Sequence, residues 1–410
     1  MNLVTVNVES IRIGQPLPFS LRDEGGVLLA SKGFVVENRA DLDLMIGRRS
    51  QLYIDAAESD SHMRAYVGKL HHLLREDKTL GQIAGTQMST SDLDTHRDKL
   101  DAGEPDWLDL QAQTHTMLRD TSPESFNTRL DKLQRQLSRY SRLNPDGTLF
   151  ALIHLSSTEV RMYSATHAML VSVMCSLAAR EVLKWPDEMA ATLCKAALTM
   201  NIGMTELQDR LAQQKEPPNP EQLRQIEQHT HRSVRLLAQL GVTDTTWLEA
   251  VQDHHTKTPG PLQSRSEGQR MARLIQRADM FAARLAPRAS RVPESSASAM
   301  QACYFDENRQ IDETGAALIK AVGIYSPGSF VRLATDEVAV VIKRGANTTT
   351  PRVAILVNRS GMPTGELIVR DTSKREFRII TGIAHRDVKV QINLERLLVL
   401  TKAPVSDRLW

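Results

Sequence analysis

The sequence predicts a mainly α-helical protein with a small β-rich unit at each end. The pattern of apolar residues is helical throughout residues 149–327, and it changes to short apolar runs separated by polar turns from about residue 328. The first 56 residues also contain apolar segments on either side of a turn signal. We therefore expect four segments, at residues 1–56, 57–148, 149–327 and 328–410.

The N-terminal segment is predicted to form a β hairpin. Leu17–Phe19 leads into the polar turn Arg22–Gly26, which is followed by Val27–Leu29. Because glycine and aspartate favour the conformations of tight turns, two strands joined at this turn are the simplest arrangement.

Residues 57–148 are rich in lysine, aspartate, glutamine and serine, with apolar residues such as Leu130, Leu133 and Leu137 at helical spacing. This composition predicts amphipathic helices joined by a mobile linker around Thr86–Pro105. We expect a spacer without chemistry of its own. A homodimer through these helices is one assembly that the sequence allows.

The segment 149–327 is expected to be helical. His167 has Tyr163 four residues before it and Leu170, Val171 and Met174 after it, which places it on the inward face of a helix. A second helix is predicted from Pro220 to Leu240, ended by Gly241. The residues from Pro287 to Ser298 are expected to form a loop.

The C-terminal segment is expected to be a small β unit. Its apolar runs lie at residues 338–342, 353–357, 367–369 and 377–380, and polar turns separate them.

The composition and charge of the chain exclude several classes of function. The chain has 410 residues, a formal net charge of +2 and 41% hydrophobic residues. It shows no long block of like charge and no apolar stretch of 18 residues, so we expect neither nucleic-acid binding nor a membrane span. The first residues lack the apolar core of a signal peptide, and three scattered cysteines are typical of reduced thiols. We expect a cytoplasmic protein.

Five residues are candidate metal ligands: His167, His229, His254, His255 and Asp279. Imidazole and carboxylate groups are common ligands of Zn, Fe and Mn. His254 and His255 precede Thr256–Pro261, which should end a helix, and two adjacent imidazoles serve one site best at a helix end.

Asp279 lies on an apolar helical face, where an ionised carboxylate requires a cation or a partner. The alternative to a metal is an ion pair with Arg277 or Arg284, or a contact with a helix N-terminus. The alternative for each histidine is a packed or solvated side chain without a ligand.

Several stretches, in this order, carry a family resemblance. They are Tyr163–His167, Thr199–Met204, Ile226–His229, His254–Gly260 and Ala278–Ala283, followed by Tyr325–Leu333 and Glu337–Val341. Together they resemble the HD domain of the HD-GYP group, metal-dependent phosphodiesterases of bacterial cyclic di-GMP signalling. The first 55 residues also resemble an N-terminal module found in such proteins. The resemblance implies an HD-type helical domain and a metal centre.

The chain departs from that family where the chemistry is concentrated. Met200 and Asn201 stand in place of the His-Asp dyad whose carboxylate bridges two metals in the family. Met204 replaces a lysine that would contact substrate phosphate. The signature loop has Thr256 for glutamate, Pro259 for aspartate and residues 262–264 for Gly-Tyr-Pro.

The resemblance implies that His229, His254 and His255 can still hold one metal with a water in the fourth position. His167 and Asp279 belong to the other half, which lacks its shared ligand. We expect one divalent metal (Fe, Mn or Zn) or none, and no catalytic residue at Met200 or Asn201.

Three functions follow as hypotheses. The first is a degenerate HD-GYP-type domain that does not hydrolyse cyclic di-GMP and serves as a regulatory output or scaffold for protein partners of a bacterial signalling pathway. The second is a metal-dependent phosphodiesterase with a mononuclear site. The third is a cyclic-dinucleotide sensor that does not hydrolyse its ligand. In a sensor, Lys257 and Arg273, with Arg161 and Arg232, would meet phosphates; the alternative is that all four are solvated at the surface.

Overall fold

The computed structural model describes residues 3–8, 11, 13–14, 17, 19–25, 27–30, 34–46, 51–55, 105–119, 122–158, 160–390 and 392–402. Residues 57–104, and with them nearly all of the predicted linker, lie outside this part of the chain. The chain divides into two compact units, Met1–Asp109 and Leu110–Trp410. The finer predicted boundaries at residues 56, 148 and 327 stay predictions.

The N-terminal unit contains a four-stranded antiparallel sheet with one helix. Its elements are β1 (Leu3–Val6), β2 (Leu21–Arg22), β3 (Leu28–Ala30), α1 (Arg39–Ile46) and β4 (Leu52–Asp55), and the strand order is β1-β4-β2-β3. The predicted hairpin is β2–β3, although its first strand begins at Leu21 rather than Leu17. The Asp23 carboxylate accepts hydrogen bonds from the backbone N–H groups of Gly25 and Val27, which fixes the turn.

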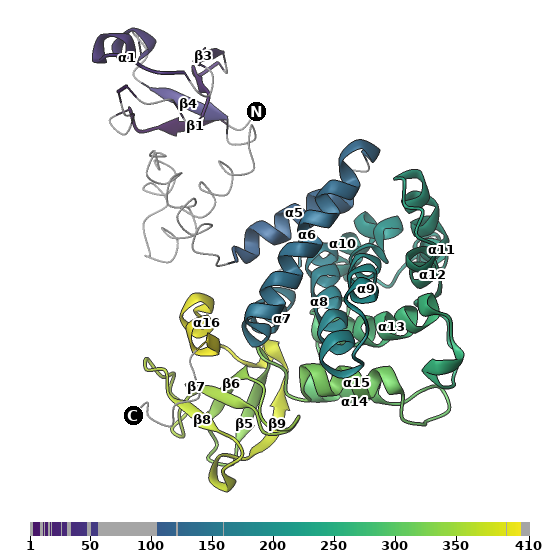
Figure 1. Cartoon of the computed structure of the whole chain (residues 1–410). Helices are drawn as coiled ribbons and strands as arrows, with labels where there is room; N and C mark the ends of the chain where they lie inside the picture. Colours follow the sequence, from purple (N-terminus) through teal and green to yellow (C-terminus); the bar gives the residue numbers. More distant parts are fainter. Residues whose placement is uncertain are drawn as a thin grey trace. The chain divides into compact units, whose positions relative to one another are not determined.

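The second unit begins with a helical layer. Its helices are α5 (Trp107–Arg119), α6 (Pro123–Leu143), α7 (Pro145–Thr158), α8 (Tyr163–Leu177), α9 (Asp187–Thr199), α10 (Thr205–Gln213), α11 (Pro220–Gln239), α12 (Thr245–Asp253), α13 (Glu267–Leu285), α14 (Ser296–Tyr304) and α15 (Glu313–Val322). All residues of α8 are buried, and α7, α9 and α13 pack around it (Figure 1). The predicted mainly helical class is confirmed.

Local sequence signals explain the helix boundaries. Asn219 caps α11 in a reciprocal capping box with Gln222, and Gly241 follows the helix with φ +84°, a left-handed conformation that glycine adopts without strain. The predicted loop from Pro287 is too long by three residues, because Ser295 caps α14 and the helix begins at Ser296. The three cysteines are buried and free, as expected.

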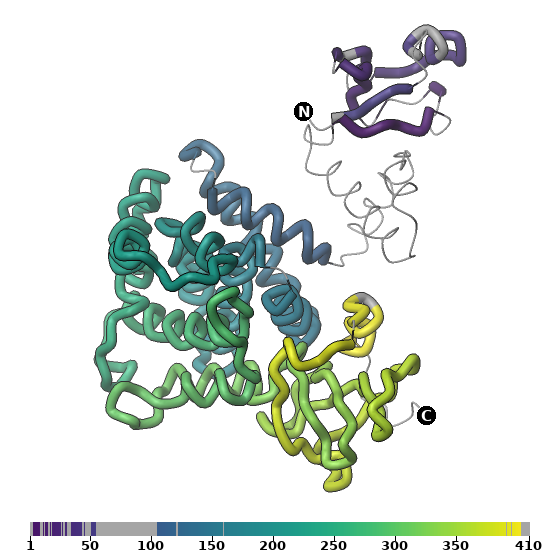
Figure 2. The backbone as a smooth tube through the Cα atoms, turned by 180° about the vertical axis from the view of Figure 1, so that it is seen from behind, coloured from purple at the N-terminus to yellow at the C-terminus, as the bar shows by residue number. Residues whose placement is uncertain are grey.

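A five-stranded antiparallel sheet follows the helices. Its strands are β5 (Phe330–Leu333), β6 (Val338–Lys343), β7 (Arg352–Val357), β8 (Val369–Asp371) and β9 (Ile379–Ile383), in the order β8-β7-β6-β5-β9. The helix α16 (Leu394–Lys402) packs against α7 and β6 (Figures 1 and 2). The expected β unit is confirmed, but β5 and α16 were not predicted as elements. Among the described residues, no helix combines the length and the apolar character needed to cross a membrane.

Two histidines meet where α7 contacts the C-terminal sheet. The ring centroids of His154, on α7, and His385, in the turn after β9, lie 5.9 Å apart. Neither His154 Nδ1 nor His385 Nε2 has a hydrogen-bond partner among the described residues. Burial, with a smaller contribution from His154, lowers the pKa of His385 to about 4.

This pair predicts acid sensitivity of the fold. Below pH 6.5 the unfolded chain protonates His385, whereas the folded chain does so only near pH 4. The free energy of unfolding should therefore fall by about 1–3 kcal/mol from this residue as the pH drops across that window. Urea denaturation at pH 7 and pH 5 should show a smaller pH dependence in His385→Phe. Replacement of the exposed His231 by phenylalanine should leave the dependence unchanged; equal slopes in all three proteins would contradict the prediction.

Candidate metal centre

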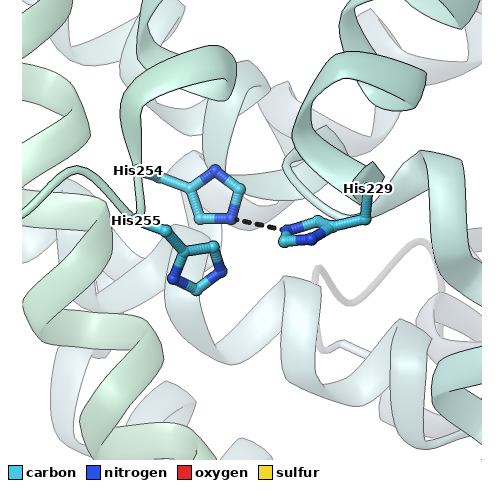
Figure 3. Close-up of side chains that lie close together, drawn as sticks. All are labelled: His229, His254 and His255. Carbon is cyan, nitrogen blue, oxygen red and sulfur yellow. Dashed lines mark hydrogen bonds between the residues drawn. The ribbon is translucent and has the colours of Figure 1, made fainter. Parts of the chain in front are cut away.

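Three histidines gather where the middle of α11 faces the end of α12. His229 comes from α11, and His254 and His255 directly follow α12 (Figure 3). One ligand atom from each of the three lies within 4.8 Å of the others. The Thr256 N–H donates to the Asp253 carbonyl and turns the chain at this point. The helix end predicted to bring the two adjacent imidazoles together is confirmed.

Backbone hydrogen bonds orient two of the rings. His229 Nδ1 donates to the Ile226 carbonyl at 2.5 Å, and His254 Nδ1 donates to the Val251 carbonyl at 2.7 Å. In the neutral form both Nε2 atoms are then unprotonated acceptors. These two atoms face each other at 3.3 Å (Figure 3). Two lone pairs at this distance repel each other, and a cation between them would relieve the repulsion.

A metal ion fits this position better than a proton. Burial, then the neighbouring His255 and His229, lowers the pKa of His254 to about 3, and burial lowers the pKa of His229. Two nitrogens bound at about 2.0–2.1 Å to a tetrahedral ion lie about 3.3–3.4 Å apart, which matches the observed separation. His255 is exposed and supplies a third imidazole. The chemistry of the three histidines therefore fits one metal ion.

His167 and Asp279 form a hydrogen-bonded pair that is not part of the three-histidine ligand group but interacts electrostatically with it. His167 Nε2 donates to Asp279 Oδ1 at 2.7 Å, and the ring of His167 stacks on Tyr163. Burial alone would raise the pKa of Asp279, but the hydrogen bond and charge of His167, and then the neighbouring His255 and His254, hold it below its usual value. The alternative ion pair is wrong, because Arg277 binds Asp312 and Arg284 binds Glu294.

Met200 and Asn201, which stand in place of the family's His-Asp dyad, supply no charged ligand. Met200 is buried at the end of α9, and Asn201 Oδ1 is buried without a hydrogen-bond partner among the described residues. The segment is fixed closely to α11: Gly203 N donates to Ser233 Oγ, and a Cβ at Gly203 would lie 2.7 Å from the Ser233 nitrogen. Position 203 therefore has no space for a side chain.

A buried charge network holds the chain after His255. Gln276 Nε2 donates to the Thr256 carbonyl at 3.1 Å, and Arg273 Nη1 donates to Gln276 Oε1 at 2.7 Å. The Arg273 guanidinium also binds Glu307 and Asp312 at 2.8 and 2.7 Å. Gln276, Glu307 and Asp312 were not identified from the sequence as members of this network. The only local signal was the spacing of three residues between Arg273 and Gln276.

The four residues predicted to contact phosphate differ in their exposure to solvent. Arg273 is buried and bound to carboxylates, so the surface position considered for it is wrong. Lys257 is exposed two residues after His255, and Arg161 and Arg232 are also exposed.

Comparisons with known proteins identify an HD domain in the helical part of the chain. Residues 151–315 match the family model described as HD domain. The chain is 23% identical to the cyclic di-GMP phosphodiesterase PA4108 of Pseudomonas aeruginosa over 235 residues, which are 56% of this chain and 56% of that protein. The chain thus spans just over half the length of this curated relative.

A solved structure, Bd1817, a HDG"Y"P protein from Bdellovibrio bacteriovorus, is similar with a TM-score of 0.42 and 15% identity, over 77% of this chain and 98% of that chain. Residues 151–315 carry the HD-domain match, and the chain resembles the HD-GYP family.

Proposed function

We propose that this HD-GYP-type domain holds one divalent metal on His229, His254 and His255 and does not hydrolyse cyclic di-GMP. The protein would then act as a regulatory output or scaffold in signalling that uses this nucleotide. The observation that carries the proposal is that His229 Nε2 and His254 Nε2 face each other at 3.3 Å while both Nδ1 atoms contact backbone carbonyls, beside a segment without a bridging carboxylate.

A second metal lacks a shared ligand. Two-metal hydrolysis requires ions about 3.5–4 Å apart that act on the same water and leaving group. Met200 offers a buried thioether, which is a soft ligand, and Asn201 offers one neutral amide oxygen. The Asp279 carboxylate is already hydrogen-bonded to His167. These contacts support a mononuclear centre.

The ligand set favours zinc. Three neutral imidazoles suit Zn and Fe better than Mn, which prefers carboxylate oxygens. Such a metal, when bound, would supply Lewis acidity and lower the pKa of a coordinated water. Because His255 is exposed, the open position would be accessible from solvent. This accessibility favours a second candidate function, a metal-dependent phosphodiesterase with a mononuclear site.

A third candidate is a cyclic di-GMP sensor without hydrolysis. The exposed ammonium group of Lys257 lies two residues after His255, where it could meet a phosphate of a nucleotide at the centre. Protein partners would dock on the N-terminal unit or on the helices that precede residue 149.

A hydrolysis assay distinguishes the three. Incubation of cyclic di-GMP with the full chain and Mn²⁺, Fe²⁺ or Zn²⁺ should yield no linear product by chromatography. Turnover that disappears in His255→Ala would overturn the proposal in favour of the phosphodiesterase. Saturable nucleotide binding without turnover, weakened by Lys257→Ala but not by Lys132→Ala on α6, would instead support the sensor.

A further inference from the structure

A basic groove lies between α6 and the segment that joins α8 to α9, outside the histidine cluster. The two adjoining hollows that form it have volumes of about 410 and 440 Å³. We call it the arginine groove. Its cationic side chains are Arg135, Arg139, Arg142, Arg180 and Lys184. Asp187 is the one carboxylate among the lining residues that the structure describes, so the groove carries a large excess of positive charge.

One face of α6 supplies three of these cations. Arg135, Arg139 and Arg142 follow one another at spacings of four and three residues, which places them on the same side of the helix. Seven residues of helix rise about 10 Å, so the charges extend farther than one phosphate group. Arg142 binds Asp187 at 2.7 Å, whereas Arg135 and Arg139 are exposed and form no ion pair with any described residue.

The opposite side holds a guanidinium without a carboxylate partner. Arg180 is partly buried, and it donates to the Ser176 carbonyl and to Ser141 Oγ at 3.2 and 3.0 Å. Both acceptors are neutral, and no described carboxylate lies within ion-pair distance of it. Burial and the positive charge of Arg142 lower the pKa of Arg180. An anion in the groove would relieve this repulsion.

An unusual backbone conformation positions Lys184 and Trp185. Residues Ala178–Val182 form a π-helical turn, with Leu183 N bonded to the Ala178 carbonyl and Trp185 N bonded to the Ala179 carbonyl. Lys184 adopts φ +57°, which is rare for a residue with a side chain. Such π turns recur at functional sites. Here the turn brings Lys184 and the indole of Trp185 to the end of the groove.

We propose that the arginine groove binds a small molecule with two or more adjacent phosphate groups. Guanidinium groups match phosphate oxygens in a bidentate geometry, and the length of the Arg135–Arg142 face fits a phosphate chain. The chemistry is shared by inorganic pyrophosphate and by the phosphate chain of a nucleotide, in which case the base would stack on Trp185.

Calorimetric titration of the full chain with pyrophosphate and with ATP tests the proposal. EDTA in the buffer keeps metal-dependent binding at the histidine cluster out of the signal. Saturable binding of pyrophosphate or ATP is expected. The double variant Arg135→Glu/Arg139→Glu should weaken it about ten-fold or more, because each reversal replaces attraction by repulsion. Both residues are exposed, so the fold should persist, and the far-UV circular dichroism spectrum checks this.

A matched control separates a site from general surface charge. Lys132→Glu reverses an exposed charge on the same helix outside the groove and should change the affinity by less than about two-fold. ATP binding that is tighter than pyrophosphate binding and weakened by Trp185→Ala would identify a nucleotide; equal affinities would identify the phosphate chain alone. The proposal is overturned if neither ligand binds at millimolar concentration, if sulfate binds equally well, or if Lys132→Glu weakens binding as much as the double variant does.

Discussion

Replacement of His254 by alanine is expected to lower the affinity of the chain for Zn²⁺ by about a hundred-fold or more. Its Nε2 faces His229 Nε2 at 3.3 Å, and its ring is fixed by the hydrogen bond from Nδ1 to the Val251 carbonyl. Loss of even an outer partner of a ligand costs about 10–100-fold in metal affinity, so loss of a pre-oriented ligand should cost at least the upper end of that range. Competition with a chromophoric chelator measures the change.

Two control variants test whether the loss of Zn²⁺ affinity is specific to the three-histidine group. His231→Ala removes an exposed imidazole from the same helix as His229 and should leave the affinity unchanged. His167→Gln should also have little effect, because His167 pairs with Asp279 outside the three-histidine group. If His167→Gln weakens Zn²⁺ binding as strongly as His254→Ala, then the buried pair belongs to the same site and the three-histidine assignment is wrong.

The substitution Arg273→Met is expected to lower the free energy of unfolding by about 3–5 kcal/mol. The guanidinium is buried and binds the carboxylates of Glu307 and Asp312, and methionine would leave these acids without their cation. Gln276 would lose the donor that orients its oxygen and, with it, part of its hold on the Thr256 carbonyl. Urea denaturation of the metal-free chain at pH 7 measures the loss.

The comparison for Arg273 is Arg284, an arginine of the same helix in a more exposed ion pair. Arg284 binds Glu294 at 2.7 Å, with both side chains about a third exposed. Arg284→Met should cost less than about 1 kcal/mol, since solvent screens such pairs. Similar losses in the two variants would show that the Arg273 network contributes no more than a surface contact.

The sequence contained the signals that place the three histidines. Pro220 and the glycine at position 241 bounded the predicted helix that is α11, and Thr256–Pro261 follow the end of α12. Periodicity alone put His167 on a buried face, and α8 is buried along its whole length. Each of these signals acts within a few residues, so local physical rules were sufficient to find them.

Contacts between distant segments were beyond such rules. Arg273 and Asp312 lie 39 residues apart, and neither residue indicates the other before the helices are packed. The partner of Asp279 was sought among arginines on its own helix, whereas the structure supplies His167 from α8. The short strand β5 and the helix α16 depend on packing against β6 and α7, which a window of sequence cannot show.

Metal analysis of the purified chain tests the mononuclear centre most directly. After incubation with excess Zn²⁺, Fe²⁺ or Mn²⁺ and removal of free ions, elemental analysis should find one equivalent per chain, with Zn²⁺ retained best. That equivalent should be absent from His254→Ala. Two or more equivalents of Fe or Mn would contradict the centre proposed on His229, His254 and His255, as would a chain that retains no metal at all.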